Sequence, residues 1–229
     1  MLKWLHLILK DLLFPKQCFG CGCWGWFICV TCREQLRSQK FQRCIVCQKP
    51  SLGGWTHPRC KTKFTPGRLI TIFDYHQKII SQAINTGKLA LAPEVFIELA
   101  ECGAERIEIR HAQTWRFVLC PIPQTPTKTR WRGFNQSELI ATVFSNKFGL
   151  AIDHLLLKSK NTRQQKTLNK LERGVNLRSA FKLTSTESLS AEVILIDDIT
   201  TTGATFLEAT KVLKRGGIKT VWCLALAQD

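Results

Sequence analysis

The chain has 229 residues, enough for one large domain or for a small domain followed by a medium one. Its formal net charge is +16, and basic residues concentrate in 1–68 and 128–182, which favours polyanionic partners. No segment is long and apolar enough to span a bilayer, and the G-x-x-x-x-G-K-[ST] motif is absent. We therefore expect neither a membrane-spanning protein nor a P-loop nucleoside triphosphatase.

The first element is a short apolar run over residues 1–14. Lys3, Lys10 and Asp11 interrupt the run, and no small-residue cleavage site follows it. We predict an amphipathic helix that packs on the rest of the protein, rather than a signal peptide or a membrane anchor.

Four pairs of metal-binding residues follow, each pair separated by two residues. They are Cys18 and Cys21, Cys29 and Cys32, Cys44 and Cys47, and His57 and Cys60. Because tetrahedral Zn²⁺ needs two such pairs, the spacing predicts two structural zinc sites. Sequential pairing is the simplest arrangement, with the first two pairs on one ion and the last two on the other. A crossed pairing, and a part for Cys23, stay open.

A disulfide framework is the alternative for so many cysteines. The regular spacing and the lack of a credible signal peptide favour metal binding and a cytoplasmic protein. Zinc would supply folding energy that a short, loop-rich segment cannot obtain from its core. We assign residues 1–64 to an N-terminal helix and a double zinc ribbon, with Thr65-Pro66-Gly67 as the linker.

Residues 68–229 alternate strand-like and helix-like segments, which predicts a three-layer α/β domain with a parallel sheet. Buried-strand patterns occupy 69–73, 117–120, 193–196 and 221–227, and helical periods occupy 78–84, 89–102, 137–148 and 206–213. Residues 85–88 interrupt the first helical region. Ligands of such sheets bind at the carboxyl ends of the strands, so we expect the site where 120–136 and 197–205 converge.

A polar, basic loop follows the strand at 117–120. It contains Lys128, Arg130 and Arg132 and leads into a helix N-terminus, an arrangement suited to a diphosphate. The alternative is a solvated basic turn.

Residues 158–182 are rich in Lys, Arg, Asn and Gln, the composition of a mobile lid over an active site. Arg163, Lys166 and Arg173 are its candidates for contact with the same anion. A solvated basic helix is the competing interpretation.

Residues 193–205 read Val-Ile-Leu-Ile-Asp-Asp-Ile-Thr-Thr-Thr-Gly-Ala-Thr. The loop amides at the start of the next helix suit a phosphate, whereas Asp197 and Asp198 suit the hydroxyls of an attached sugar or a hydrated Mg²⁺. Walker B segments and phospho-acceptor domains also end a buried strand in two acids, but Thr-Thr-Gly-x-Thr is narrower than either. The stretch therefore predicts a ribose-phosphate clamp made of Asp197, Asp198, Thr200, Thr201, Thr202, Gly203, Ala204 and Thr205.

This stretch closely resembles the phosphoribosyl-diphosphate (PRPP) signature of type I phosphoribosyltransferases. Essentially the whole chain resembles the ComF family of competence-associated phosphoribosyltransferases. The matching motifs are Leu13-Phe14-Pro15, the cysteine pairs, Pro121-Ile122-Pro123, Arg132-Gly133-Phe134-Asn135-Gln136, Thr162-x-x-Gln165, Arg173-x-x-Asn176 and Phe181. Two positions depart from the family: Asn85 replaces the usual Lys, with Lys88 following it, and His57 replaces a cysteine of the second zinc site.

The resemblance implies a type I phosphoribosyltransferase fold behind the zinc ribbon, and an enzyme that serves DNA uptake. Its reaction would transfer the 5-phosphoribosyl group of PRPP, bound with Mg²⁺, to an unidentified nitrogen acceptor. Asp197 and Asp198 would act as the catalytic residues that hold the ribose, the loop Thr201 to Thr205 would hold the 5′-phosphate, and Arg130 and Arg132 would hold the diphosphate.

The alternative function is a non-catalytic accessory of the competence machinery. In that interpretation the clamp is inherited but only binds, while the zinc module and the basic surface grip single-stranded DNA alongside other competence proteins.

Overall fold

The computed structural model describes residues 16–89, 92–107, 117–158, 180–184 and 192–229. The predicted N-terminal helix and most of the predicted lid, with Arg163, Lys166 and Arg173, lie outside these ranges. None of the helices in them is long and apolar enough to cross a membrane.

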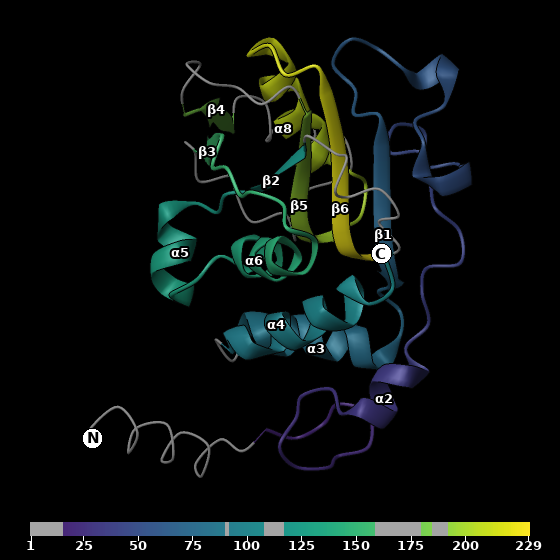
Figure 1. Ribbon diagram of the computed structural model, residues 1–229, viewed down its shortest axis with the longest axis vertical. Coiled ribbons are helices and arrows are strands. Elements are labelled where there is room, and N and C mark those ends of the chain that lie inside the picture. The colour runs from purple at the N-terminus through teal and green to yellow at the C-terminus, as the bar shows by residue number, and fades with distance from the viewer. Residues whose placement is uncertain (1–15, 90–91, 108–116, 159–179, 185–191) are drawn as a thin grey trace.

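The centre of the fold is a parallel sheet (Figure 1). Its strands, in spatial order, are β1 (Arg68–Asp74), β6 (Thr220–Gln228), β5 (Glu192–Thr200) and β2 (Phe117–Pro121). Successive side chains of a strand point to opposite faces, so Ile194 and Ile196 join one core and Val193 and Leu195 join the other. Burial on both faces explains why this strand is a continuous apolar run in the sequence.

Helices cover both faces of the sheet, which confirms the expected three-layer α/β fold (Figure 1). One layer contains α3 (Lys78–Leu89), α4 (Pro93–Ala104) and α6 (Gln136–Phe148). The other contains α8 (Ala204–Arg215) and an antiparallel ribbon of β3 (Leu156–Lys158) and β4 (Phe181–Leu183). A short helix, α5 (Pro126–Arg132), links β2 to α6.

The predicted interruption at residues 85–88 is wrong, because α3 continues through them to Leu89. Gly87 does not break the helix; it lets α4 pack closely. A Cβ atom at this position would lie 2.6 Å from Cε2 of Phe96, so only glycine accommodates the ring against the helix backbone. The next helix begins at Pro93, where the fixed φ of proline suits a first turn.

Two other boundaries differ from the sequence prediction. The basic segment after β2 contains α5, whose N-cap Thr125 accepts a hydrogen bond from the backbone N–H of Lys128, instead of being a plain loop. The two acids Asp197 and Asp198 lie within β5, where Asp197 pairs with Ala225 of β6, so the loop begins only after Thr200.

The cysteine-rich segment is built from short elements, namely α2 (Val30–Gln35), η1 (Leu52–Gly54) and η2 (Pro58–Cys60). Its two halves join different cores. Ile28 and Leu36 are buried with the α3, α4 and α6 layer, whereas Ile45 is buried with the α8 layer.

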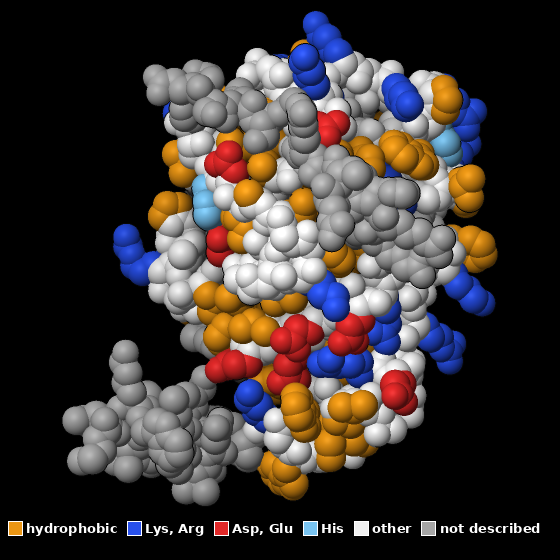
Figure 2. Space-filling model, viewed as in Figure 1, with side chains coloured by type: hydrophobic (Ala, Val, Ile, Leu, Met, Phe, Trp, Pro, Cys, Tyr) orange, Lys and Arg blue, Asp and Glu red, His pale blue; other side chains and the backbone are white. Residues whose placement is uncertain are grey.

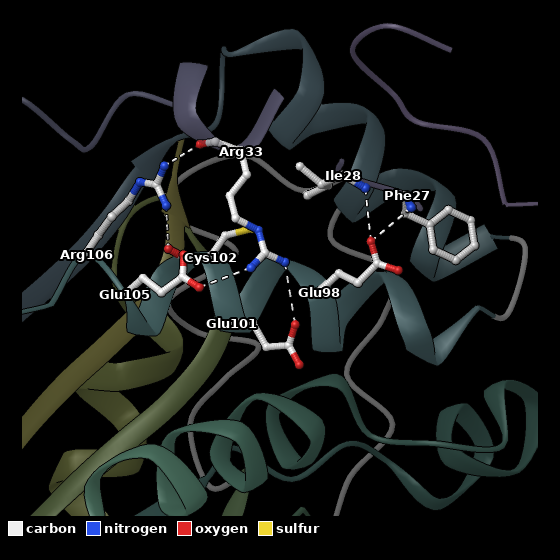
Figure 3. A network of polar contacts seen from close by, with 8 residues as sticks. All are labelled: Phe27, Ile28, Arg33, Glu98, Glu101, Cys102, Glu105 and Arg106. Atoms are coloured by element: carbon white, nitrogen blue, oxygen red, sulfur yellow. Dashed lines mark hydrogen bonds and ion pairs between the residues drawn. The ribbon is translucent and has the colours of Figure 1, made fainter. Parts of the chain in front are cut away.

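A polar network fastens the first half of this segment to α4 (Figure 3). The buried carboxylate of Glu98 accepts hydrogen bonds from the backbone N–H groups of Phe27 (2.9 Å) and Ile28 (3.0 Å). Arg33 pairs with Glu105 at 3.1 Å. Figure 2 shows acidic and basic side chains gathered in the lower part of the view, over α2 and α4.

Candidate functional site

The two acids at the end of β5 are held by a defined set of donors. The carboxylate of Asp197 accepts hydrogen bonds from the Ser137 hydroxyl at 2.9 Å and from the backbone N–H of Asp198 at 3.0 Å. Asp198 accepts one from the N–H of Ile199 at 2.8 Å. A buried polar group is stable only when it is paired, so these donors fix the orientation of both acids.

Lys88 forms an ion pair with Asp198, with 2.7 Å between Nζ and Oδ2. The side chain of Lys88 is 24% exposed and that of Asp198 is 9% exposed, so water screens this pair less than a surface pair. Lys88 reaches the acid because α3 continues into the last turn that carries it. At the position that departs from the family, Asn85 accepts a hydrogen bond from the Tyr75 hydroxyl at 3.2 Å.

Three further cations interact with the acid pair. The pKa values of Lys128, Arg132 and Lys158 are all lowered, mainly by burial. The charge of Asp198 partly opposes this at Lys128 and Arg132, and the charge of Asp197 partly opposes it at Lys128 and Lys158. The Nε of Arg132 is buried and has no hydrogen-bond partner within the described ranges. The positive charges of Lys128, Arg132 and Lys158 are suited to a multiply charged anion.

Of the two arginines proposed for the diphosphate, the structure brings Arg132 to the acid pair. Arg130 lies on the same helix with its side chain exposed, and the contacts of the described residues join it to neither acid.

Burial, and secondly the negative charge of Asp198, raise the pKa of Asp197 to about 7. The Ser137 hydroxyl, the N–H of Asp198 and the charge of Lys88 oppose this rise. The proton on this carboxyl group is therefore gained and lost close to neutral pH. A cation or a sugar hydroxyl bound there would shift that equilibrium.

The loop after the acids presents backbone N–H groups at the start of α8. Gly203 is the N-cap, with φ of 73°, and none of the described side chains caps this end of the helix. The first N–H groups of α8 therefore have no intrahelical or capping partner, and the positive end of the helix dipole lies beside them. Thr201 is exposed, and Thr202, Ala204 and Thr205 are half-buried.

Thr200 ends β5 and is buried. Its carbonyl accepts a hydrogen bond from the N–H of Asp229 at 3.0 Å, which fixes the point from which the loop leaves the sheet.

The motif of residues 132–136 connects β2 to the acid pair. Gly133, with φ of 77°, ends α5, and Asn135 caps α6 by accepting from the N–H of Ser137 at 3.2 Å. The Asn135 amide also donates to the carbonyl of Ile122 at 3.1 Å. These bonds anchor the start of α6 to the end of β2 and direct Ser137 toward Asp197.

The first two cysteine pairs form one cluster. The ligand atoms of Cys18, Cys21, Cys29 and Cys32 all lie within 4.8 Å of one another. Burial raises the pKa of Cys18, but N–H donors from Cys29, Cys21 and Gly20 outweigh it and lower the value to about 6, which favours the thiolate that binds metals. A Cβ on Gly20 would lie 2.4 Å from Sγ of Cys32, so only glycine leaves room for that sulfur.

Cys23 is exposed and lies outside this set of four. Hydrogen bonds with Cys21 and Cys29 raise its pKa to about 12, so it remains a thiol beside the cluster.

The second cluster joins Cys44, Cys47, His57 and Cys60, whose ligand atoms also lie within 4.8 Å of one another. The Nε2 of His57 is 3.2 Å from the carbonyl of Pro50, which can only accept, so Nε2 carries the proton. Nδ1 then presents its lone pair toward Sγ of Cys47, 3.3 Å away. This tautomer is the one that a metal ligand needs.

Both clusters follow the sequential arrangement, and none of the eleven cysteines forms a disulfide bond. Four cysteines in one set, and three cysteines with one histidine in the other, are donor sets compatible with tetrahedral zinc.

The sequence alone did not identify Lys88, Ser137 and Lys158 as members of the site. Lys88 belonged to a segment interpreted as a break, although its helical register is visible once the period of 78–84 is extended. Ser137 opened a predicted helix with no sign of its partner, and Lys158 was one of many basic residues in the predicted lid.

The parallel sheet, the acid pair in β5 and the loop before α8 together define a phosphoribosyltransferase-like fold, here with two cysteine clusters that can bind metal ions. No family model matches the chain. The chain is 30% identical to DNA utilization protein YhgH of Salmonella typhimurium over 229 residues, which cover 93% of this chain and 98% of that protein.

Two competence proteins also match. Competence protein F of Haemophilus influenzae is 32% identical over 115 residues, covering 48% of this chain and 50% of that protein. Competence protein ComFC of Bacillus subtilis is 25% identical over 203 residues, covering 83% and 79%. The chain belongs to the ComF family.

Proposed function

We propose that this protein binds PRPP with Mg²⁺, transfers the 5-phosphoribosyl group to a nitrogen acceptor, and serves the use or uptake of DNA. The observation that carries the proposal is the acid pair, with four cations around it and an uncapped helix N-terminus directly after it. The names of the relatives, a DNA utilization protein and two competence proteins, support the biological setting.

Each part of the site suits one part of PRPP. Asp197 and Asp198 accept hydrogen bonds from ribose hydroxyls, and the N–H groups and hydroxyls of 201–205 bind the 5′-phosphate. Lys88, Lys128, Arg132 and Lys158 offer charge to the diphosphate. Without a ligand, the ion pair with Lys88 neutralises the buried carboxylate of Asp198. A bound ligand would compete with Lys88 for this carboxylate.

Paired carboxylates also suit a hydrated Mg²⁺, and the metal would reduce the charge of the leaving diphosphate. The rest of the catalysis falls to positioning. The ribose gains positive character as diphosphate leaves, so residues that hold the sugar while stabilising the departing charge lower the barrier.

Calorimetric titration of Mg–PRPP into the purified protein tests this function. Wild type should give saturable binding, and Asp197→Asn with Asp198→Asn should weaken it more than tenfold without lowering the metal content. Asp74→Asn is the matched control, because Asp74 is an acid at the carboxyl end of the parallel strand β1 but is not among the acids that interact with the four cations. Normal binding by the double variant, or no binding by wild type, would overturn the proposal.

A second candidate function, binding of single-stranded DNA, is favoured by a different surface. An open cleft of about 870 Å³ lies beside the start of α3 and the end of β1. Four cations line it, against the single acid Asp74, and Phe41 projects at its edge with 70% exposure; the cations are Arg37, Lys40, Arg43 and Lys78. A positive groove with an exposed aromatic ring is the arrangement on which unpaired bases stack.

Lys40→Ala with Phe41→Ala tests this candidate against the first. DNA affinity should fall about tenfold and its salt dependence should become shallower, since fewer counterions are released, while PRPP binding stays unchanged. DNA binding that the acid-pair variant abolishes and the cleft variant leaves intact would contradict it.

A further inference from the structure

The second cysteine cluster contacts the loop proposed to bind the 5′-phosphate. Ile45 lies inside the turn between its ligands Cys44 and Cys47, and Gln48 directly follows that turn. Ile45 lies against Gly203 of the loop, and Gln48 bonds to Thr202, which is 154 residues further along the chain.

Ile45 packs against the loop at Gly203. Its side chain is fully buried in the core of the α8 layer, to which Phe206 and Ala209 of α8 also belong. A Cβ built on Gly203 would lie 2.6 Å from Cγ1 of Ile45 and 3.4 Å from its carbonyl oxygen. The loop glycine therefore lies directly on the metal-binding turn, and displacement of that turn would displace the loop.

Gln48 bonds the loop to the turn. Its side-chain amide donates to the carbonyl of Thr202 at 3.1 Å and to the carbonyl of Ile45 at 2.8 Å. Gln48 has φ of 59°, the only positive φ of a described residue other than glycine. This uncommon backbone conformation aims the amide, and the N–H of Gln48 bonds to the carbonyl of Cys44 at 2.8 Å.

A bound metal would fix this turn, because two of its four ligands, Cys44 and Cys47, flank Ile45. Engaging the Thr202 carbonyl also fixes the peptide between Thr202 and Gly203, whose N–H belongs to the proposed phosphate-binding set. The metal and the ligand loop are thus connected by one side chain in van der Waals contact and one amide.

We propose that the second cysteine cluster sets the conformation of the loop at 201–205, with Gln48 as a positioning residue, so that metal bound there raises affinity for ribose-phosphate ligands. The identity of the ligand rests on the proposed function; the coupling between cluster and loop does not. The first cluster offers a contrast, since Cys18, Cys29 and Cys32 are buried in the core of the opposite layer.

One pair of variants separates the two clusters. Cys60→Ala removes a ligand of the second cluster and Cys21→Ala a ligand of the first, so each should cost about one metal ion per chain. We expect PRPP affinity to fall tenfold or more in Cys60→Ala and to stay within twofold of wild type in Cys21→Ala.

A second pair leaves every metal ligand in place. Gln48→Ala should weaken PRPP binding roughly fivefold, the effect of losing one hydrogen bond that orders the loop. Gln48→Gly should give the same loss even though glycine relieves the positive φ, which separates the amide from the backbone strain. Gln42→Ala is the control, because Gln42 also joins this segment to the sheet but bonds to Thr71 of β1 (2.7 and 2.9 Å).

Hydrogen exchange of residues 199–207 without ligand gives a readout that does not need PRPP. Exchange should be faster in Cys60→Ala and Gln48→Ala than in wild type, and unchanged in Cys21→Ala and Gln42→Ala. Unchanged exchange in Gln48→Ala, or an equal acceleration in its control, would overturn the coupling even if Cys60→Ala fails to fold. Absence of PRPP binding by wild type would overturn the proposed function, while the exchange data would still decide the coupling.

Discussion

The two cysteine clusters share their ligand spacing but differ in what they hold. The first is fastened to α4 by the buried Glu98 and by Arg33, within the core of the α3, α4 and α6 layer. The second places Ile45 under Gly203 and bonds Gln48 to Thr202. The same ligand spacing thus packs against the helical layer in one place and against the loop before α8 in the other, so spacing alone does not tell which part of the fold a cluster contacts.

The largest effect is expected from a substitution that disrupts only the first cluster. Gly20→Ala would place a Cβ 2.4 Å from Sγ of Cys32, which displaces a metal ligand. We expect one metal ion fewer per chain and a free energy of unfolding lower by about 4 kcal/mol or more. Metal analysis and denaturant unfolding measure both, and an unchanged metal content would contradict the assignment of Cys32.

The next effect concerns the attachment of the first cluster. Glu98→Ala leaves the buried N–H groups of Phe27 and Ile28 without their acceptor, which should lower the free energy of unfolding by about 2–3 kcal/mol. Glu101→Ala is the control. Its ion pair with Arg33 is long, at 3.6 Å, and its side chain is 49% exposed, so it should cost less than about 0.5 kcal/mol. Equal losses in chemical unfolding would show that the network does not depend on Glu98.

A smaller effect probes the loop on the second cluster. Gly203→Ala adds a Cβ against Ile45 in a backbone with φ of 73°, which should cost about 2 kcal/mol of stability and weaken PRPP binding. The clash is specific to one neighbour, so Ile45→Ala should destabilise the Gly203→Ala protein less than it destabilises wild type. Strictly additive unfolding energies in this double-mutant cycle would argue against the contact.

The smallest effect is a pH dependence at the acid pair, which directly precedes the loop that the second cluster contacts. The pKa of Asp197 is raised from 3.8 to about 7, so its ionisation opposes folding. This cost is absent below about pH 4, grows as pH rises toward 7 and is complete above it. Asp197→Asn should therefore raise the free energy of unfolding at pH 8, with the gain vanishing toward pH 4. A gain that grows on acidification would contradict the raised pKa.

The sequence predicted what depends on local pattern. The apolar run 193–196 gave a doubly buried strand, the period of 206–213 gave α8, and the cysteine spacing gave two sequential clusters. In each case the residues that determine the outcome lie within a few positions of one another, so periodicity and spacing are sufficient.

The misses arose where a distant residue decides a local outcome. Gly87 remains helical because Phe96 of another helix packs on it, and the preference of glycine for turns gave no sign of this. Likewise, the ion pair of Lys88 with Asp198 and the contact of Ile45 with Gly203 join segments that only the folded sheet brings together. Sequence reasoning treated the cysteine-rich segment as a module of its own, and therefore could not connect it to the loop before α8.

The most direct test of the central claim is competition at the acid pair and loop. Mg–PRPP is titrated calorimetrically into the metal-loaded wild-type protein, with and without ribose 5-phosphate. The account predicts saturable binding of about one PRPP per chain, weakened in proportion to the added ribose 5-phosphate because both ligands occupy the same loop. No saturable heat, or PRPP binding that ignores ribose 5-phosphate, would contradict a ribose-phosphate site at residues 197–205.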